Sequence, residues 1–355
     1  MESGETSGEG FGMTFGVDIG TTSVSGVAVG ADGKIALSVS IAHKADLPAS
    51  AAGAFEQDPA KLLAATEAVL GQLGAKDAPD ADIGWTGQMH GVVGVDASLD
   101  AVTPFVTWRD RRLYGGRVMA GWAAEGRKVF KCLPVCGYVI AKMTGRCVID
   151  PTFLHAWYLD EFGGDVRASL DAWLPECEES SMLGDNQAGV SAAQGVLPGS
   201  AVVNIGTSGQ LSVVLDEPFG GPCLPGAAAE NGLRTERRPY PGGRTLLCRA
   251  AIAGGRAWAD LREELGLSWD EMNAADDPRV KACAERIVGE LVGGIDLSGV
   301  TGVIGVGNGL VRNPALRAAV ERRLGVTCQI PGIPELAAYG AALHVQSFKK
   351  GNKSS

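Results

Sequence analysis

The segment "FGVDIGTTS", Phe15–Ser23, places a strand-like apolar run directly before a turn made of a glycine and three hydroxyl residues. A related sequence occurs later in the chain: Val17–Thr22 reads Val-Asp-Ile-Gly-Thr-Thr, and Val203–Ser208 reads Val-Asn-Ile-Gly-Thr-Ser. Each copy is followed by a second apolar run, which is the pattern of two strands joined by a tight glycine turn. The repeat predicts two similar domains, although two unrelated hairpins can show so short a match by chance.

Neither turn has the composition of a standard phosphate-binding motif. No Lys follows the glycine as in a Walker A loop, and no further glycines stand at Rossmann spacing. Such a turn still offers successive N–H groups and Thr hydroxyls, and its glycine leaves room for a polyphosphate. We therefore predict phosphate contacts from both turns, with Asp18 beside a divalent cation on the phosphates. A turn-capping role is the structural alternative for Asp18.

Composition narrows the class of protein. The chain has 355 residues, 45% hydrophobic and 20% charged, which is typical of a soluble globular protein with room for two domains. A net charge of -10 argues against binding to nucleic acid or to an anionic membrane. The 8 cysteines form no CxxC pair, which favours reduced thiols in a cytoplasmic protein. The first residues lack the basic start and apolar run of a signal peptide.

Hydrophobic periodicity predicts an α/β protein. A helix is expected to begin at Asp58-Pro59 and to end at Gly74, and another is expected to begin at Asn313-Pro314 and to end at Gly325. The expected domains are 12–197 and 198–348, with tails at 1–11 and 349–355. The remaining expected elements are strands at 15–19, 24–29 and 35–41, helices near 255–265 and 279–292, a strand before the glycine-rich loop at 305–309, and a final helix over 334–343.

Four polar segments carry candidate chemistry. In "LGDNQAG", Asp185 and Asn186 lie between a strand and a helix, where an Asp serves either as a helix cap or as a base for a sugar hydroxyl. The "GVGNG" loop at 305–309 points a helix N-terminus at a ligand, or is a structural turn. In "TGQMHG", His90 is either functional or an ordinary core residue. The "TWRDRR" segment reads, taken alone, as a solvated ion-pair cluster.

Together these segments resemble the FGGY carbohydrate kinase family. The segments "FGVDIGTTS", "GQMHG", "TWRDRR", "LGDNQAG", "NIGTSGQL", "GVGNGLVRNPAL" and "AAYGAAL" stand in the family's order, from Phe15 to Leu343. The resemblance implies two RNase H-like α/β domains around a nucleotide cleft, the fold of sugar kinases, actin and Hsp70. Within the family, the motifs look most like those of sedoheptulokinases, with xylulokinases next.

The resemblance also implies cofactors and residue roles. ATP and Mg²⁺ are the expected cofactors, Asp185 is similar to the general base, and Asp18 to the magnesium-associated carboxylate. Phosphate-binding positions are matched by Thr21, Thr22, Ser23, Gly206 and Thr207, and adenosine-binding positions by Gly254, Gly307, Asn308 and Asn313. Positions at the sugar are matched by Gln88, Met89, His90, Trp108, Asp110 and Asn186.

The expected function is therefore ATP-dependent phosphorylation of a ketose hydroxyl, with sedoheptulose as the expected sugar. The chain is shorter than typical members, with little sequence between Arg112 and Cys136, between Leu215 and Arg244, and between Leu265 and Pro278. The alternatives are a xylulose, ribulose or glycerol kinase of the same family, and a non-catalytic nucleotide-binding relative that lost part of the sugar pocket. The expected partner is a small sugar, with a homodimer left open and neither nucleic acid nor membrane.

Overall fold

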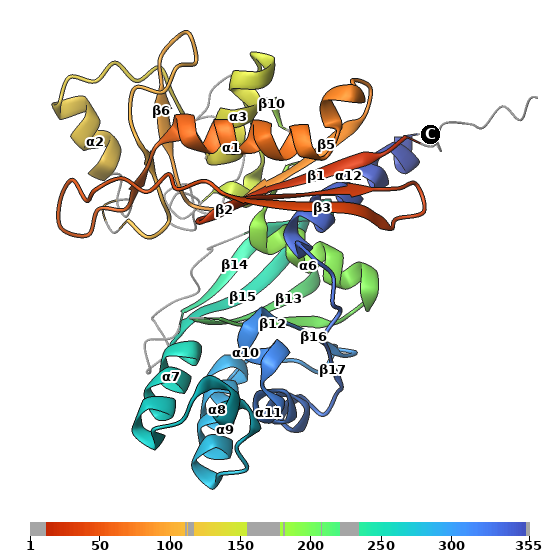
Figure 1. The fold of residues 1–355 in the computed structure, drawn as a ribbon. Coiled ribbons are helices and arrows are strands. Elements are labelled where there is room, and N and C mark those ends of the chain that lie inside the picture. Colours follow the sequence, from red (N-terminus) through yellow and green to blue (C-terminus); the bar gives the residue numbers. More distant parts are fainter. Residues whose placement is uncertain are drawn as a thin grey trace, which may run out of the picture. The chain divides into compact units, whose positions relative to one another are not determined.

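The computed structural model describes residues 12–110, 112, 117–154, 178–179, 182–206, 208–220 and 234–352. Thr207 lies outside the described residues. The chain divides into two compact units. The first consists of Met1–Phe153, Glu176–Gly189 and Pro334–Ser355, and the second of Leu154–Pro175 and Val190–Ile333. Figure 1 labels the elements of both units.

The first unit is built on a five-stranded sheet in the order β11-β5-β1-β2-β3. Strands β1, β2 and β3 form an antiparallel meander, whereas β5 and β11 continue the sheet in parallel with β1. The predicted meander is thus confirmed to within one residue at each strand end. The strands are β1 (Thr14–Ile19), β2 (Ser23–Val29), β3 (Ile35–Ala42), β5 (Asp82–Gly87) and β11 (Leu183–Gly184).

Two helices cover opposite faces of this sheet (Figure 1). Helix α1 (Pro59–Gln72) begins at Asp58, whose carboxylate accepts from the N–H of Ala60. A Cβ on Gly26 of β2 would contact Val69 and the following Leu73, so α1 lies on that face. A Cβ on Gly16 of β1 would overlap the carbonyl of Ala338, so α12 (Leu336–Asn352) lies on the other. The glycines allow each helix to pack against the sheet backbone.

Smaller elements complete the first unit. Paired short strands form small sheets, and α3 packs against β5. The short helix α2 had no counterpart among the predicted elements. These elements are β4 (Glu56–Gln57), β6 (Val93–Val95), β7 (Phe105–Val106), β8 (Lys131–Leu133), β9 (Val148–Ile149), β10 (Glu178–Glu179), α2 (Arg117–Ala124) and α3 (Val135–Thr144).

The second unit repeats the strand order of the first. Its six-stranded sheet runs β14-β15-β13-β12-β16-β17, with β12, β13 and β15 antiparallel and β16 and β17 parallel to β12. The order equals that of the first sheet with β14 added at the edge, which confirms the predicted duplication. The strands are β12 (Ala201–Ile205), β13 (Gly209–Pro218), β14 (Arg234–Tyr240), β15 (Arg244–Ile252), β16 (Val303–Val306) and β17 (Cys328–Gln329).

Alternating residues divide the second core into two layers. Val203 and Ile205 of β12 pack with residues of the five helices that follow the sheet strands, given below, whereas Val202 packs with Val190 of α6 (Asp185–Val196). This alternation is the period-2 pattern of a sheet covered on both faces. The helices are α7 (Gly254–Leu265), α8 (Trp269–Ala274), α9 (Pro278–Val292), α10 (Gly307–Arg312) and α11 (Pro314–Leu324).

The predicted domain boundary needs a correction at the C-terminus. The range 198–348 assigned the last helix to the second domain, but α12 packs on β1 and β5 and belongs to the first unit. Small residues explain the change. A Cβ on Gly84 of β5 would overlap the Ala341 carbonyl, and one on Gly340 would overlap the Ala188 carbonyl. Such close approach fixes α12 against the first sheet.

Two further features concern cysteines and hydropathy. The six cysteines among the described residues are free thiols. No helix in the described part of the chain combines the length and hydropathy needed to cross a bilayer.

Candidate active site

Three parallel strands of the first unit end at one edge of the sheet. In the register, Gly87 of β5 lies beside Ile19 of β1 and beside Gly184 of β11. The residues that follow these strands are Gly20, Gln88 and Asp185, so the predicted turn, the "GQMH" segment and the predicted base meet at that edge. Ligands of α/β sheets bind outside the carboxyl ends of parallel strands. The first unit therefore brings these sequence motifs into one site.

Asp18 is a carboxyl group at this edge whose pKa departs strongly from its usual value. Its Oδ1 is buried and accepts no hydrogen bond from the described residues. Burial, followed by the charges of Asp185 and Glu335, raises the pKa of Asp18 to about 8. A buried carboxylate oxygen without a protein donor, with two more acids nearby, fits a divalent cation, which would neutralise this charge.

Protein groups alone do not complete a metal site. Within the described ranges, no set of three or more acidic, His or Cys side chains could hold a metal ion. Mg²⁺ usually keeps several waters and is held by one or two carboxylates together with substrate phosphates. The single orphaned oxygen of Asp18 agrees with that mode of binding.

Asp18 predicts a pH dependence of stability in the absence of metal. Its pKa is about 8 in the folded chain and about 3.9 in an unfolded one. The stability associated with its proton is therefore present below about pH 4 and is lost as the pH rises through 8. Asp18→Asn has no carboxyl group to ionise, so we expect its stability not to fall in this way. The free energy of unfolding of the variant should therefore exceed that of the wild type by an amount that grows between about pH 5 and 8. Urea unfolding in EDTA measures the difference, and a constant difference over that range would contradict the pKa.

Buried amides hold the Gly20–Ser23 turn in place. The N–H of Gly20 donates to the carbonyl of Ser23 at 3.0 Å. Nε2 of Gln57 donates to the carbonyl of Thr21 at 2.7 Å, and Nε2 of Gln88 donates to Oε1 of Gln57 at 2.9 Å and to the carbonyl of Gly20 at 3.3 Å. Gln88, predicted to contact sugar, thus has its amide engaged with the turn. Gln57 was missed because its short strand gives no sequence signal.

The side chain of Thr21 also has protein partners. Its Oγ1 accepts from Nε1 of Trp108 at 3.0 Å and lies 3.5 Å from Oε1 of Gln88. Trp108 is nevertheless 49% exposed, so about half of the residue's surface remains available to a ligand. Thr22 is exposed and Ser23 partly so. Of the three predicted phosphate-binding residues in this turn, Thr22 is therefore the most accessible.

The residues around Asp185 are closely packed. Met89 is buried, and a Cβ on Gly184 would lie 2.7 Å from its sulfur, so Met89 packs on the backbone that precedes Asp185. His90 has a φ of +67°, which is unusual for a residue with a side chain and often marks a functional site. The N–H of Asn186 donates to Oδ1 of Asp185 at 2.7 Å. The predicted sugar-side residues Met89, His90 and Asn186 therefore belong to the same strand edge as Asp185.

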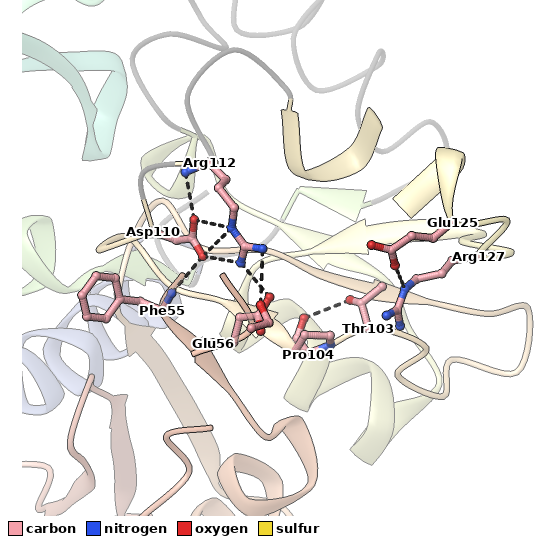
Figure 2. Close-up of polar contacts among 9 residues, drawn as sticks. Phe55, Glu56, Thr103, Pro104, Asp110, Arg112, Glu125 and Arg127 are labelled. Carbon is pink, nitrogen blue, oxygen red and sulfur yellow. Dashed lines mark hydrogen bonds and ion pairs between the residues drawn. The ribbon is translucent and has the colours of Figure 1, made fainter. Parts of the chain in front are cut away.

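Asp110 is held by protein groups, as Figure 2 shows. Its Oδ2 accepts from the N–H of Phe55 at 2.9 Å, and its two oxygens accept from Nε and Nη2 of Arg112, which also pairs with Glu56 at 2.6 Å. Burial raises the pKa of Asp110, but the hydrogen bonds from Arg112 and Phe55 outweigh it and keep the pKa below its usual value. The carboxylate fixes Asp110 and Arg112 against Phe55 and Glu56, and its contact with sugar stays a prediction.

This cluster predicts a stability difference between two acid substitutions. We expect Asp110→Asn to lower the free energy of unfolding by about 2–3 kcal/mol, because Arg112 is only 32% exposed and loses its main partner. Glu125→Gln is the matched control. Glu125 pairs with Arg127, as Figure 2 also shows, and the two side chains are 58% and 40% exposed, respectively. We therefore expect Glu125→Gln to lower the free energy of unfolding by only about 0–1 kcal/mol. Urea unfolding measures both, and equal losses would contradict the assignment.

The second unit contains a pocket of about 870 Å³ at the end of β12. Gly206, Gly307 and Asn308 line it, as the nucleotide prediction requires. Gly307 has a φ of +79°, and a Cβ there would overlap Oδ1 of Asn204, so only glycine fits. Gly254 and Asn313 do not line this pocket. Gly254 packs behind it against Gly209, and Asn313 caps α11.

Several pocket residues were not predicted as ligand contacts. Arg256 and Trp258 lie on the helix predicted near 255–265, whose periodic pattern gives no sign of a ligand. The others lie on α8 and α10, which are too short for a periodic signal. The additional lining residues with polar or aromatic side chains are Arg256, Trp258, Trp269, Asn273 and Arg312.

Comparison with known sequences finds similarity to carbohydrate kinases. The profile of the FGGY family of carbohydrate kinases, N-terminal domain, matches residues 13–145. These residues are similar to the N-terminal domain of FGGY carbohydrate kinases. A xylulose kinase from Klebsiella pneumoniae is 26% identical over 261 residues, which cover 56% of this chain and 53% of that protein. The match thus spans about half the length of the curated relative.

Solved structures confirm the sugar kinase fold. A "xyloylose kinase" from Brucella ovis matches with a TM-score of 0.75 and 19% identity, over 96% of this chain and 90% of the other. A gluconate kinase from Lactobacillus acidophilus gives 0.71 and 15%, with the same coverage. Glycerol kinase with ADP from Plasmodium falciparum gives 0.68 and 13%, over 95% and 90%. These likenesses establish the two-domain α/β fold predicted from the sequence.

Proposed function

We propose that the chain is an ATP-dependent carbohydrate kinase that transfers a phosphoryl group to a hydroxyl of a ketose. One observation carries the proposal: Asp185, the buried Asp18 and the Gly20–Ser23 turn lie together at the carboxyl edge of three parallel strands. A phosphoryl transferase needs a base, a metal-associated carboxylate and backbone donors for phosphate, and this edge supplies the residue types for all three.

Asp185 is the proposed general base. As the sugar oxygen forms its bond to the γ-phosphorus and the bond to the leaving ADP breaks, the hydroxyl proton passes to the Asp185 carboxylate. Asp18 would hold Mg²⁺ through the oxygen that lacks a protein donor. When bound, Mg²⁺ neutralises charge on the phosphates. Gly206, Thr207, Gly307 and Asn308 are proposed to receive the nucleotide, and Gly254 and Asn313 to shape its site from behind.

The proposed substrate is a ketose of the sedoheptulose or xylulose type. Sedoheptulose follows from the sequence motifs, and the xylulose kinase from Klebsiella pneumoniae favours the second sugar. Met89, His90, Trp108 and Asn186 are the proposed sugar contacts, with Gln88 and Asp110 supporting the surrounding loops. We place the enzyme in the cytoplasm, and a homodimer is compatible with the proposal.

ADP release from the purified chain tests the proposal. Mg-ATP is supplied with sedoheptulose, xylulose, ribulose, fructose or glycerol in turn, and the rate without sugar is the baseline. We expect one ketose to raise the rate well above that baseline and to yield a sugar phosphate detectable by mass spectrometry. Binding of ATP without stimulation by any sugar would instead favour the non-catalytic nucleotide-binding alternative.

A further inference from the structure

One edge of the first sheet is formed by β3, which lies last in the strand order (Figure 1). Its sequence, "IALSVSIA", contains no charged residue and no proline over 8 residues. The edge of a sheet presents backbone donors and acceptors to which another strand can pair, and proteins usually blunt it with a short strand, a charge or a proline. Strand β3 has none of these three features.

The other edges of the two large sheets are protected. Strand β11, at the far edge of the first sheet, has 2 residues, and so has β17 at one edge of the second. Strand β14, at the remaining edge, has 7 residues but reads "RTERRPY", so it carries charges and a proline. In the described part of these two sheets, β3 is therefore the edge that is both long and uncharged.

Backbone groups of β3 point away from its neighbour β2. Just after the strand, the N–H of His43 donates to the carbonyl of Thr22 at 3.3 Å. Hydrogen-bonded and non-hydrogen-bonded pairs alternate along an antiparallel ladder. Counted back from His43, the odd-numbered residues from 37 to 41 bond to β2, whereas the N–H and C=O groups of Ser38 and Ser40 face outward. No described residue other than those of the β2 ladder bonds to the backbone of this strand.

The sequence of β3 is symmetrical about Val39. Ser38 and Ser40 lie on either side of it, and Leu37 and Ile41 lie one position further out. In an antiparallel pair of two copies centred on Val39, Leu37 of one chain faces Ile41 of the other. The serines face each other in the same way, and their outward backbone groups fall at the hydrogen-bonded pairs. The strand therefore complements a second copy of itself in both side chains and backbone.

The apolar side chains of β3 are only partly covered within one chain. Leu37, Val39 and Ile41 share the sheet face under α1, because Val39 pairs with Gly26, whose Cβ would contact Val69 of α1. Leu37 is nevertheless 44% exposed. Like charges facing each other across strands are destabilising, and this strand brings none to a second copy. Pairing would cover the exposed apolar surface and satisfy the outward N–H and C=O groups.

We propose that β3 is a homodimer surface, at which two copies of the chain pair antiparallel about a two-fold axis at Val39 and join their first sheets. A bulge at Ala36, where the register with β2 shifts, limits the regular pairing to about residues 37–42. So short a segment buries little area, so the dimer belongs to the weak, reversible class. The inference goes beyond the proposed function and does not depend on it.

Sedimentation velocity of the full chain over a dilution series tests this surface. We expect the wild type to pass from a dimer to the 36.6 kDa monomer on dilution. Leu37→Lys should be monomeric throughout, because it places a charge where the strands meet. Val196→Lys is the matched control, since Val196 is a 43% exposed apolar residue of the second unit, and it should dimerise as the wild type does. A monomeric wild type, or wild-type dimerisation of Leu37→Lys, would overturn the inference.

Ser38→Pro tests the backbone pairing. Proline removes the outward N–H of Ser38 and leaves the bonds to β2, and edge strands tolerate it at such positions. We expect Ser38→Pro to be monomeric and Ser38→Thr, which keeps the N–H, to dimerise. Circular dichroism checks that each variant is folded. A folded Ser38→Pro that dimerises as strongly as the wild type contradicts the pairing, and if this variant does not fold, the exposed Leu37→Lys decides.

Cysteine cross-linking tests the register. The Cα atoms of the two Val39 copies form a non-hydrogen-bonded pair about 4.5 Å apart, which a disulfide can span. Val39→Cys should therefore give a covalent dimer when copper phenanthroline and oxygen oxidise the two thiols. Leu37→Cys alone should not, because its two copies are offset by four residues, about 13 Å, but a mixture with Ile41→Cys should. The wild type, with its 8 cysteines, is the control. Cross-linking of Leu37→Cys alone, or none in Val39→Cys, would refute the two-fold axis at Val39.

Discussion

Asp185→Asn is expected to lower kcat for sugar phosphorylation by about 10³-fold while ATP affinity changes by less than about twofold. Asn keeps the size of the side chain and can still accept the hydrogen bond from the N–H of Asn186, but it cannot take the sugar proton. The loss should therefore fall on the chemical step. Single-turnover phosphorylation and separate ATP titration distinguish the two effects.

The control for this variant is another Asp at a helix start. Asp277 caps α9 by accepting from the N–H of Arg279, and Asn caps a helix as well as Asp does. Asp277→Asn should leave kcat and ATP affinity at wild-type values. If Asp185→Asn kept more than about a tenth of the wild-type kcat, Asp185 would not be the base.

The second large effect is expected at the contact between β1 and α12. Gly16→Ala should lower the free energy of unfolding by about 3 kcal/mol or more, because the new methyl group would overlap the backbone carbonyl of Ala338. A carbonyl oxygen in a packed helix cannot turn away as a side chain can, so strand and helix must separate. Urea unfolding followed by circular dichroism measures the change.

Gly71→Ala is the matched control for this substitution. Gly71 lies exposed in the last turn of α1, and a Cβ there would meet nothing closer than Lys76 at 4.0 Å. Alanine in a helix is favoured over glycine by about 0.5–1 kcal/mol, so this variant should be slightly more stable than the wild type. Similar losses in both variants would mean that α12 does not pack on Gly16 as described.

The fold was predictable where a local pattern carries the information. The repeated glycine turns predicted both sheets, and Asn313-Pro314 predicted the start of α11. The position of α12 was not predictable, because its small-residue face fits any close-packed surface and only the tertiary structure shows which one. Short elements such as β4 and α8 lack enough residues for a periodic signal.

The site was predictable as a set of motifs but not as a set of contacts. The turn with Asp18, the "GQMH" segment and Asp185 could be proposed from the sequence, since each belongs to or follows a recognisable strand, and the structure brings them to one edge of the sheet. Their hydrogen bonds join residues far apart in the sequence, such as Trp108 and Thr21, which no local pattern reveals. The same holds for the indole N–H of Trp258, which is buried without a hydrogen-bond partner among the described residues.

The first unit is made of segments separated in the sequence by residues of the second unit, and this affects the order in which the two units can fold during synthesis. Residues Val190–Ile333, which form most of the second unit, are continuous and can fold as soon as they leave the ribosome. The first sheet is made earlier but must wait for α12, the last helix, to cover one of its faces. During that interval its apolar residues Val27 and Val29, which pack with Ala338 and Ala342 in the finished protein, remain open to chaperones or to other nascent chains. The unit that begins first is therefore completed last.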